Sequence, residues 1–344
     1  MDASANILLI RLKSIGDIVL TLPAVNRVRD NFPRARLTYL TSAEHAPLLR
    51  GFTAVDEVLA LNRALYRRKD PLAICAATFD LVRRLRQQRF SLVVDFQGYG
   101  ETALLTWLTR APQRWGSIYS SSRRWAYTNG PVRDDHVQIA DWNLSLLHQC
   151  GLKPGPIRNE FRLPPDALQT ALGFFAEHGC DPSKPTLFIQ PFTSSPKKNW
   201  PLKNYLALAK HWRGAGMQVL FGGGPADHAG LEPVRQGGFV TSAGLPLLTS
   251  AGLVELSTLV VGGVTGLLHL AVAMQKRVIM LIGSAAHEPA FPYQHRDWAV
   301  TAGPAQPVSS ISVDEVIAAS AQAQKAADEF TPRKESSGAN GCLE

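Results

Sequence analysis

The stretch NILLIRLKSIGDIVLTLP, residues 6–23, begins as an apolar strand and continues as an apolar helix, with the carboxylate of Asp17 at the junction. A strand that runs through a short turn into a helix is the first half of a βαβ unit, which builds parallel sheets. Charges at Arg11, Lys13 and Asp17 interrupt the stretch, so it has neither the apolar core of a signal peptide nor the length of a membrane span. It therefore predicts a strand, a turn and a helix of a folded domain.

The same alternation continues along the chain, where short apolar runs predict strands and longer patterns between them predict helices. The further strand candidates are RLTYLTS (36–42), SLVVDFQG (91–98), TLFIQPF (186–192), MQVLFGGG (217–224), TLVVGGV (258–264) and RVIMLIG (277–283). The helix candidates include TLPAVNRVRDNF (21–32), TFDLVRRLRQQRF (78–90), LKNYLALAKHWRGAG (202–216) and GLLHLAVAMQ (266–275). This order indicates an α/β protein, in which ligands bind outside the carboxyl ends of the strands.

With 344 residues, the chain is long for one core and comfortable for two domains. Residues 151–185 open with proline and glycine, carry one short helix pattern and close on proline, which indicates a link between two α/β domains. We therefore divide the chain into domains at 1–165 and 166–320, followed by 321–344. A helix pattern covers 312–330, and the end of the chain is a polar tail that we expect to be disordered.

The composition is that of an ordinary globular protein, with 45% hydrophobic and 19% charged residues. The net charge of +8 favours an acidic partner such as nucleic acid, an anionic membrane face or a phosphorylated substrate. The four cysteines lie far apart, with no CxxC pair and no metal-ligand spacing, so a reducing cytoplasm is the simplest location. We expect a soluble protein, at most attached to a membrane surface.

Asp17 follows Gly16 at the first strand-to-helix turn, where free backbone N–H groups stabilise an anion. Lys13 and Ser14 belong to the same turn. One interpretation is a carboxylate held at the mouth of a cleft as a general base. The other is an ordinary first-turn carboxylate that is favoured by the helix dipole.

Two loops of the second half could face a phosphate. After the strand at 186–192, the hydroxyls of Thr193 to Ser195 precede Lys197 and Lys198, and a lysine there could neutralise charge on a leaving group. After the strand at 217–224, glycines permit close approach of a ligand and Asp227 could bind a ribose. A solvated basic loop and a plain glycine turn are the alternatives.

The stretch VVGGVTGLLHLAVAMQ, residues 260–275, predicts a strand and then a helix that starts near Thr265. Thr265 can cap that helix, which would leave the N–H groups of Gly266, Leu267 and Leu268 available to a diphosphate. His269 is either a phosphate neighbour or an ordinary helix histidine.

Taken in order, SIGDIVLTLP, KNWP and TGLLHLA resemble the GD-x-x-x-x-x-P, K-x-WP and D-(S/T)-G-x-x-H-L-A signatures of the bacterial lipopolysaccharide heptosyltransferases, glycosyltransferase family 9. The resemblance runs from about residue 7 to about residue 302. It implies a GT-B fold, in which two Rossmann-like domains face each other across a cleft, the first binding the acceptor and the second ADP-heptose. The implied reaction is inverting and independent of metal or other cofactors, and the sequence contains no D-x-D triplet.

The resemblance also implies a role for each matched residue. Asp17 would be the base that takes the proton of the acceptor hydroxyl, and Lys198 would stabilise the departing ADP. The nucleotide-sugar site would consist of Thr193, Ser194, Gly223, Asp227, Thr265, Gly266, Leu267 and His269.

On the acceptor side, VVDFQGYGETALL is similar to the DAQG segment of the enzymes that add the first heptose to Kdo (3-deoxy-octulosonate) on lipid A. The implied acceptor is thus a Kdo–lipid A glycolipid at the cytoplasmic face of the inner membrane. The acceptor-binding candidates are Lys13, Ser14, Arg63, Arg67, Arg68, Lys69, Gln97 and Arg123. A solvated basic helix face is the alternative for the arginines.

One position departs from the family pattern, because Val264 stands where an aspartate usually precedes the (S/T)G of the phosphate loop. A valine cannot accept a hydrogen bond, which leaves open a different donor sugar or a protein that binds a nucleotide sugar without transferring it. A nucleic-acid partner is disfavoured, since the sequence has no RNP motif and no zinc-finger spacing.

Overall fold

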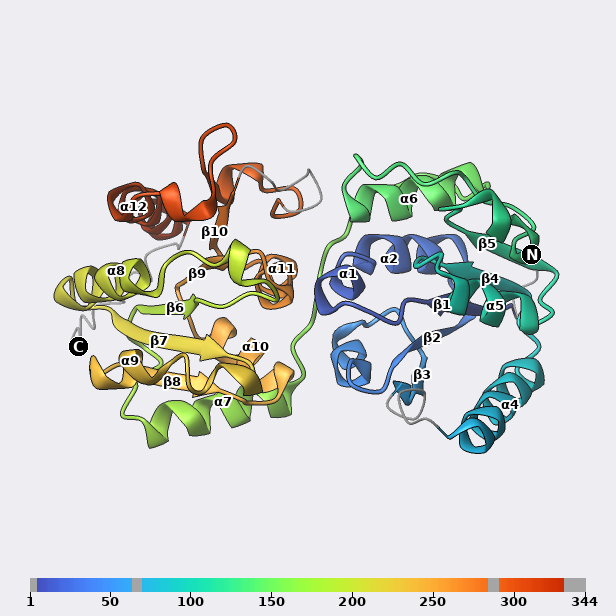
Figure 1. Cartoon of the computed structure of the whole chain (residues 1–344), viewed down its shortest axis with the longest axis horizontal. Coiled ribbons are helices and arrows are strands. Elements are labelled where there is room, and N and C mark those ends of the chain that lie inside the picture. Colours follow the sequence, from blue (N-terminus) through green and yellow to red (C-terminus); the bar gives the residue numbers. More distant parts are fainter. Residues whose placement is uncertain (1–4, 64–69, 284–290, 331–344) are drawn as a thin grey trace, which may run out of the picture.

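The computed structural model describes residues 5–63, 70–283 and 291–330, which form two lobes side by side (Figure 1). The first lobe is built on a parallel sheet with strand order β3-β2-β1-β4-β5. Its elements are β1 (Asn6–Ile10), α1 (Ile15–Val19), α2 (Leu22–Asn31), β2 (Arg36–Ser42), η1 (Ala46–Gly51), β3 (Glu57–Leu61), α4 (Pro71–Gln87), β4 (Leu92–Asp95), α5 (Gly100–Leu108), β5 (Gln113–Gly116), η2 (Ser121–Ala126) and α6 (Ile139–Gln149).

The second lobe is built on a parallel sheet with strand order β11-β10-β9-β6-β7-β8. Its helices are α7 (Pro165–Glu177), η3 (Pro196–Lys198), α8 (Leu202–Gly214), η4 (Pro225–Asp227), α9 (Glu232–Gln236), α10 (Leu247–Glu255), α11 (Gly266–Ala273), η6 (Arg296–Trp298), η7 (Val308–Ser310) and α12 (Val313–Phe330). Its strands are β6 (Thr186–Gln190), β7 (Gln218–Gly223), β8 (Val240–Ala243), β9 (Leu259–Gly263), β10 (Val278–Ile282) and β11 (Ala299–Thr301).

All seven predicted strands are confirmed, and each lies inside a sheet. The strands that the sequence did not reveal are β3, β5, β8 and β11, which are the edges of the two sheets. A central strand of a parallel sheet is covered by helices on both faces and reads as a continuous apolar run. The edge strands read EVLAL, QRWG, VTSA and AVT, too short or too polar to give that signal.

Two boundaries differ from the predicted ones. The helix expected in the link is the 13-residue α7, which packs on α10 of the second lobe, so only the segment before it crosses between the lobes. At the other end, α12 continues to Phe330, and Ala323 is buried in the second core. Residues 321–330 are therefore helix and not tail, because α12 packs against β9, β10 and β11 of the second sheet. The tail expected at 331–344 lies outside the described residues.

The crossing segment is bonded to both lobes. The backbone carbonyl of Arg158 accepts a hydrogen bond from Asn26 of α2, and that of Asn159 accepts one from Gln275, which follows α11. Phe161 donates its backbone N–H to Ala273 and packs its ring against Phe52 of the first lobe. These contacts bring α1 of the first lobe against α11 of the second.

Within the described residues, no helix is both long and apolar enough to cross a membrane.

Candidate active site

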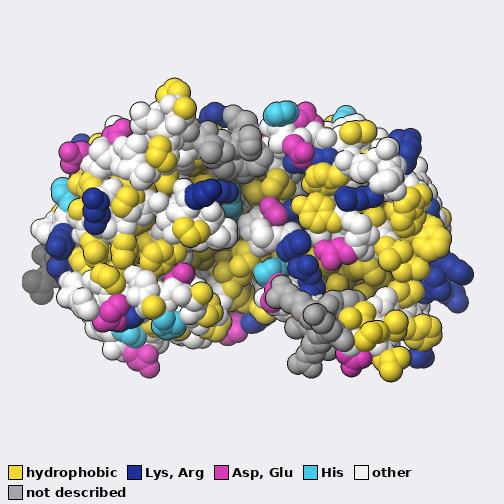
Figure 2. All heavy atoms as spheres, viewed as in Figure 1, with side chains coloured by type: hydrophobic (Ala, Val, Ile, Leu, Met, Phe, Trp, Pro, Cys, Tyr) yellow, Lys and Arg dark blue, Asp and Glu magenta, His cyan; other side chains and the backbone are white. Residues whose placement is uncertain are grey.

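A cavity of about 1350 Å³ lies between the two lobes, at the carboxyl ends of their strands. Figure 2 shows the molecule hollowed there, with both basic and acidic side chains around the opening. The predicted site residues that line it are Lys13, Ser14, Asp17, Arg63, Thr193, Ser194, Lys198, Gly223, Asp227, Thr265, Gly266, Leu267 and His269. The fold thus brings together residues that are up to 256 positions apart in the sequence, from Lys13 to His269.

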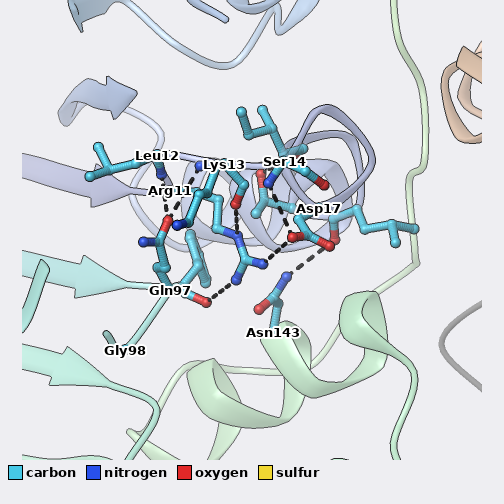
Figure 3. A network of polar contacts seen from close by, with 12 residues as sticks. Arg11, Leu12, Lys13, Ser14, Asp17, Gln97, Gly98 and Asn143 are labelled. Carbon is cyan, nitrogen blue, oxygen red and sulfur yellow. Dashed lines mark hydrogen bonds and ion pairs between the residues drawn. The ribbon is translucent and has the colours of Figure 1, made fainter. Parts of the chain in front are cut away.

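Asp17 lies in the first turn of α1 and is held from one side only (Figure 3). Its Oδ2 lies 2.6 Å from Nη2 of Arg11 and accepts a hydrogen bond of 3.1 Å from the backbone N–H of Ser14. Among the described residues, no hydrogen bond or ion pair engages Oδ1. The side chain is 28% exposed in the cleft wall, so this oxygen is available to a ligand.

Arg11, at the end of β1, is the partner that the sequence analysis did not identify. Its Nη1 and Nε donate to the backbone carbonyls of Phe96 and Lys13, at 2.7 and 2.9 Å. Burial acts to lower the pKa of Arg11, but the charge and the hydrogen bond of Asp17 outweigh it and raise that pKa above its usual value. The buried guanidinium therefore stays charged and fixes the carboxylate. The sequence pattern that could have identified Arg11 as this partner is an arginine directly after an apolar strand and six residues before the carboxylate of the turn.

Gln97 and Arg123 do not line the cavity. Gln97 is fully buried, and its Oε1 accepts from the backbone N–H groups of Leu12 and Lys13 at 2.9 and 3.3 Å. Its side-chain oxygen therefore holds the backbone of the loop between β1 and α1 in place. Arg123 donates to the backbone carbonyl of Gly98 at 3.2 Å.

Of the basic stretch near residue 63, Arg63 faces the cavity and forms an ion pair of 3.7 Å with Glu101 of α5. Arg67, Arg68 and Lys69 lie outside the described residues, so their predicted role stays a prediction.

The second lobe presents the start of α11 to the cavity. Thr265 caps this helix as predicted, with its hydroxyl accepting from the backbone N–H of Leu268 at 3.3 Å. The prediction that the N–H of Leu268 is available to a diphosphate is wrong, because the cap occupies it. Gly266 and Leu267, at the start of the helix, line the cavity, and the first N–H groups of a helix have no carbonyl partner in that helix. A side chain at Gly266 would place its Cβ 2.6 Å from the side chain of Ile15, so only glycine lets α11 approach α1 this closely.

His269 lies one turn further along α11, 6% exposed, against Gly16 of the other lobe. Burial lowers the pKa of His269 to about 4, and the nearby charge of Asp17 offsets this only in part. The imidazole is therefore neutral at pH 7, and its Nδ1 is buried without a hydrogen-bond partner among the described residues.

The loop after β6 lies over the end of β9. Asn199 accepts from the backbone N–H of Thr193 at 2.8 Å, and Thr193 Oγ1 donates to the carbonyl of Ser195 at 2.9 Å. Trp200 is buried and donates to the carbonyl of Ile311 at 2.8 Å. The tryptophan thus anchors the short helix that exposes Lys198 at the cavity.

The glycine loop after β7 is partly self-contained, because Oδ2 of Asp227 accepts from the backbone N–H of Gly224 at 2.7 Å. Gln190, at the end of β6, is a cavity residue that the sequence analysis did not identify. It is 7% exposed, and a side chain on Gly222 would collide with it. A polar residue that closes an apolar strand was its only signal.

Across the described residues, no group of three or more His, Cys, Asp or Glu side chains is placed to hold a metal ion.

The family model and several similar proteins indicate the same family. Residues 78–313 match the model of glycosyltransferase family 9 (heptosyltransferase). The lipopolysaccharide core heptosyltransferase OpsX of Haemophilus influenzae is 21% identical over 228 residues, which span 65% of this chain and 62% of that protein. A family 9 glycosyltransferase from Veillonella parvula has a similar structure, with a TM-score of 0.85 at 19% identity over 95% of this chain and 99% of the other. The Escherichia coli heptosyltransferase WaaC with ADP gives a TM-score of 0.75 at 16% identity, over 92% and 99%.

Proposed function

Because this chain belongs to glycosyltransferase family 9, the heptosyltransferases, we propose that it transfers heptose or a related sugar from an ADP-linked donor to an acidic, lipid-linked sugar of the lipopolysaccharide core. The GT-B fold implied by the sequence resemblance is confirmed, with two parallel sheets facing one cleft. The observation that carries the proposal is that Asp17, Lys198 and the start of α11 line the same cavity although they come from both lobes.

The donor would bind to the second lobe. The N–H groups of Gly266 and Leu267 and the dipole of α11 would receive the diphosphate. Lys198 would add a positive charge where negative charge develops on the departing ADP, a role that a metal ion fills in other enzymes. Asp227, whose Oδ2 is occupied by Gly224, would use its other oxygen for the ribose.

The acceptor hydroxyl would be activated by Asp17. Because Arg11 and Ser14 hold Oδ2, the proton would pass to Oδ1, which no hydrogen bond or ion pair among the described residues engages. The acceptor oxygen forms a bond to the anomeric carbon as the bond from that carbon to the diphosphate oxygen breaks, and ADP leaves. A single displacement of this kind inverts the anomeric configuration.

The acceptor would enter beside the first lobe, where Lys13 and Arg63 offer positive charge to an acidic sugar. A Kdo–lipid A type glycolipid would place the protein at the cytoplasmic face of the inner membrane, in agreement with the net charge of +8.

Mass spectrometry of a Kdo–lipid A acceptor, incubated with the protein and ADP-heptose, tests the proposal. We expect the wild-type protein to add the mass of one heptose and Asp17→Ala to add none while still binding ADP. The matched control is Asp314→Ala, which removes an exposed carboxylate of α12 outside the cavity and should behave as wild type. A fully active Asp17→Ala protein would contradict the assignment of the base.

Val264 lines the cavity beside Thr265, and this supports one alternative, a donor sugar other than heptose. If the wild-type protein binds ADP-heptose without transferring it, a panel of ADP-sugars should identify the sugar that is transferred. A protein that binds these donors and transfers none of them would be a binding protein of the same fold.

A further inference from the structure

Helix α4 lies at the outer end of the first lobe (Figure 1). Among its 17 residues only Leu85 is buried, whereas Leu72 is 83% and Phe79 is 73% exposed. These two apolar residues are seven positions apart and lie on one helix face, which Arg83 and Arg86 continue. Apolar groups exposed in this way indicate a surface that another body covers.

Helix α5 and the short helix η2 extend this surface. Trp107 and Trp125 are 49% and 53% exposed and pack edge to face, with their ring centroids 5.7 Å apart. Leu104, three residues before Trp107 on α5, is 45% exposed. Nε of Arg86 donates to the carbonyl of Leu108 at 2.9 Å, which joins α4 to α5.

Most of the exposed large apolar side chains come from one stretch of the first lobe. Within the described residues, every exposed large hydrophobic side chain except Ile157 lies between Leu72 and Val132. Figure 2 shows hydrophobic side chains over α4 and α5, beside dark-blue Lys and Arg side chains at the same edge. We name the set Leu72, Phe79, Arg83, Leu104, Trp107, Arg110, Arg124 and Trp125 the aromatic-basic surface.

The charge of the region is positive. Residues 70–125 contain eight arginines and four acidic residues. Of those four, Asp95 is fully buried, Asp80 is paired with Arg84 and Glu101 with Arg63. The arginines Arg83, Arg110 and Arg124 are exposed. The region therefore attracts an extended anionic surface.

We propose that the aromatic-basic surface docks on an anionic lipid bilayer. Tryptophan favours the membrane interface because its ring is apolar and its N–H is polar, and exposed aliphatic side chains enter the boundary of the acyl chains. Arginines beside them pair with lipid phosphates and strengthen binding to anionic leaflets. Binding of a protein partner would not require exposed arginines beside separate exposed apolar side chains.

The position of the surface suits a lipid-linked acceptor, and this part of the inference rests on the proposed function. Arg63 lines the cavity and pairs with Glu101 in the first turn of α5, so α5 connects the surface to the acceptor side of the cavity. A glycolipid could reach the cavity while its acyl chains stay in the bilayer.

Cosedimentation with vesicles tests the docking. The full chain is mixed at low salt with vesicles of phosphatidylcholine that contain about 30% phosphatidylglycerol, and with vesicles of phosphatidylcholine alone. We expect binding to the anionic vesicles that decreases as salt is raised, and weak binding to the neutral ones. Absence of binding to anionic vesicles at low salt overturns the proposal.

Variants locate the surface. Leu72→Ser combined with Phe79→Ser should weaken binding by about tenfold or more, since both side chains lose apolar contact with lipid. Arg83→Gln combined with Arg124→Gln should weaken binding to anionic vesicles by at least about tenfold. The matched controls are Ile157→Ser, on the crossing segment, and Lys210→Gln, exposed on α8 of the second lobe, which should bind as wild type. An equal loss of vesicle binding in the surface variants and in the controls contradicts the proposal.

Two further measurements separate this inference from the proposed function and from self-association. The surface variants should retain wild-type transfer to a delipidated, water-soluble acceptor, because none of the four residues lines the cavity. Vesicle binding without any transferase activity would refute the proposed function and leave the docking surface standing. Light scattering that shows a wild-type dimer and monomeric variants would assign the surface to a second copy of the chain and overturn the lipid proposal.

Discussion

His269 provides a sharp test of how the two lobes fit together, because its environment predicts a pH dependence of stability. The ring is buried between α11 and Gly16, and burial lowers its pKa from 6.5 to about 4. The unfolded chain therefore binds a proton at this residue between pH 6.5 and 4, whereas the folded chain does not. Stability supplied by this difference is present above pH 6.5 and is lost as the pH falls toward 4.

The magnitude follows from the two pKa values. A difference of about 2.5 pKa units corresponds to about 3 kcal/mol in the free energy of unfolding, of which about 2 kcal/mol is already lost at pH 5. The substitution His269→Gln removes the titratable ring, so the variant should lack this pH-dependent part of the free energy of unfolding. Between pH 7 and pH 5 the wild-type protein should lose about 2 kcal/mol more than His269→Gln, whatever the stability of the variant at pH 7.

Urea unfolding followed by tryptophan fluorescence at several pH values measures this difference. His211→Gln, which changes an exposed histidine of α8, is the matched control and should follow the wild-type curve. If His269→Gln loses as much stability as the wild type between pH 7 and pH 5, the ring is not buried as described, and the close contact of α1 with α11 is wrong.

Three further predictions concern the same contact. Arg11→Met should lower turnover by about 100-fold or more with little change in ADP affinity, because Asp17 loses the group that orients it; steady-state kinetics and calorimetry check this, and unchanged kcat would refute it. Thr265→Ala should cost about 1 kcal/mol in urea unfolding and Thr265→Ser should restore it, since the hydroxyl caps α11; equal stability of all three proteins would deny the cap. Gly266→Ala should destabilise the protein by about 1–3 kcal/mol through its clash with Ile15, although alanine favours a helix; a more stable variant would show that the lobes are not in contact there.

The sequence predicted the central strands and the turns that carry the site. A strand covered by helices on both faces must be apolar along its whole length, and the turn after it must carry the polar groups. For this reason the run at 6–10 and the turn at Asp17 could be read directly, as could the run at 259–263 and the helix start at Thr265. The motif resemblance gave the family, because its signatures lie in these turns.

The tertiary structure decided what the local pattern could not express. Edge strands such as β3 and β5 form because a neighbour is available for pairing, which the residues EVLAL and QRWG do not show by themselves. Likewise, the polar residue Gln97 was predicted to face the acceptor, but burial behind the β1–α1 loop directs its amide to the backbone of that loop. The ion pair of Arg11 with Asp17 and the approach of His269 to Gly16 also depend on folding. These contacts arise from packing between elements distant in sequence, whereas the pattern of one segment records only whether that segment is covered by other elements.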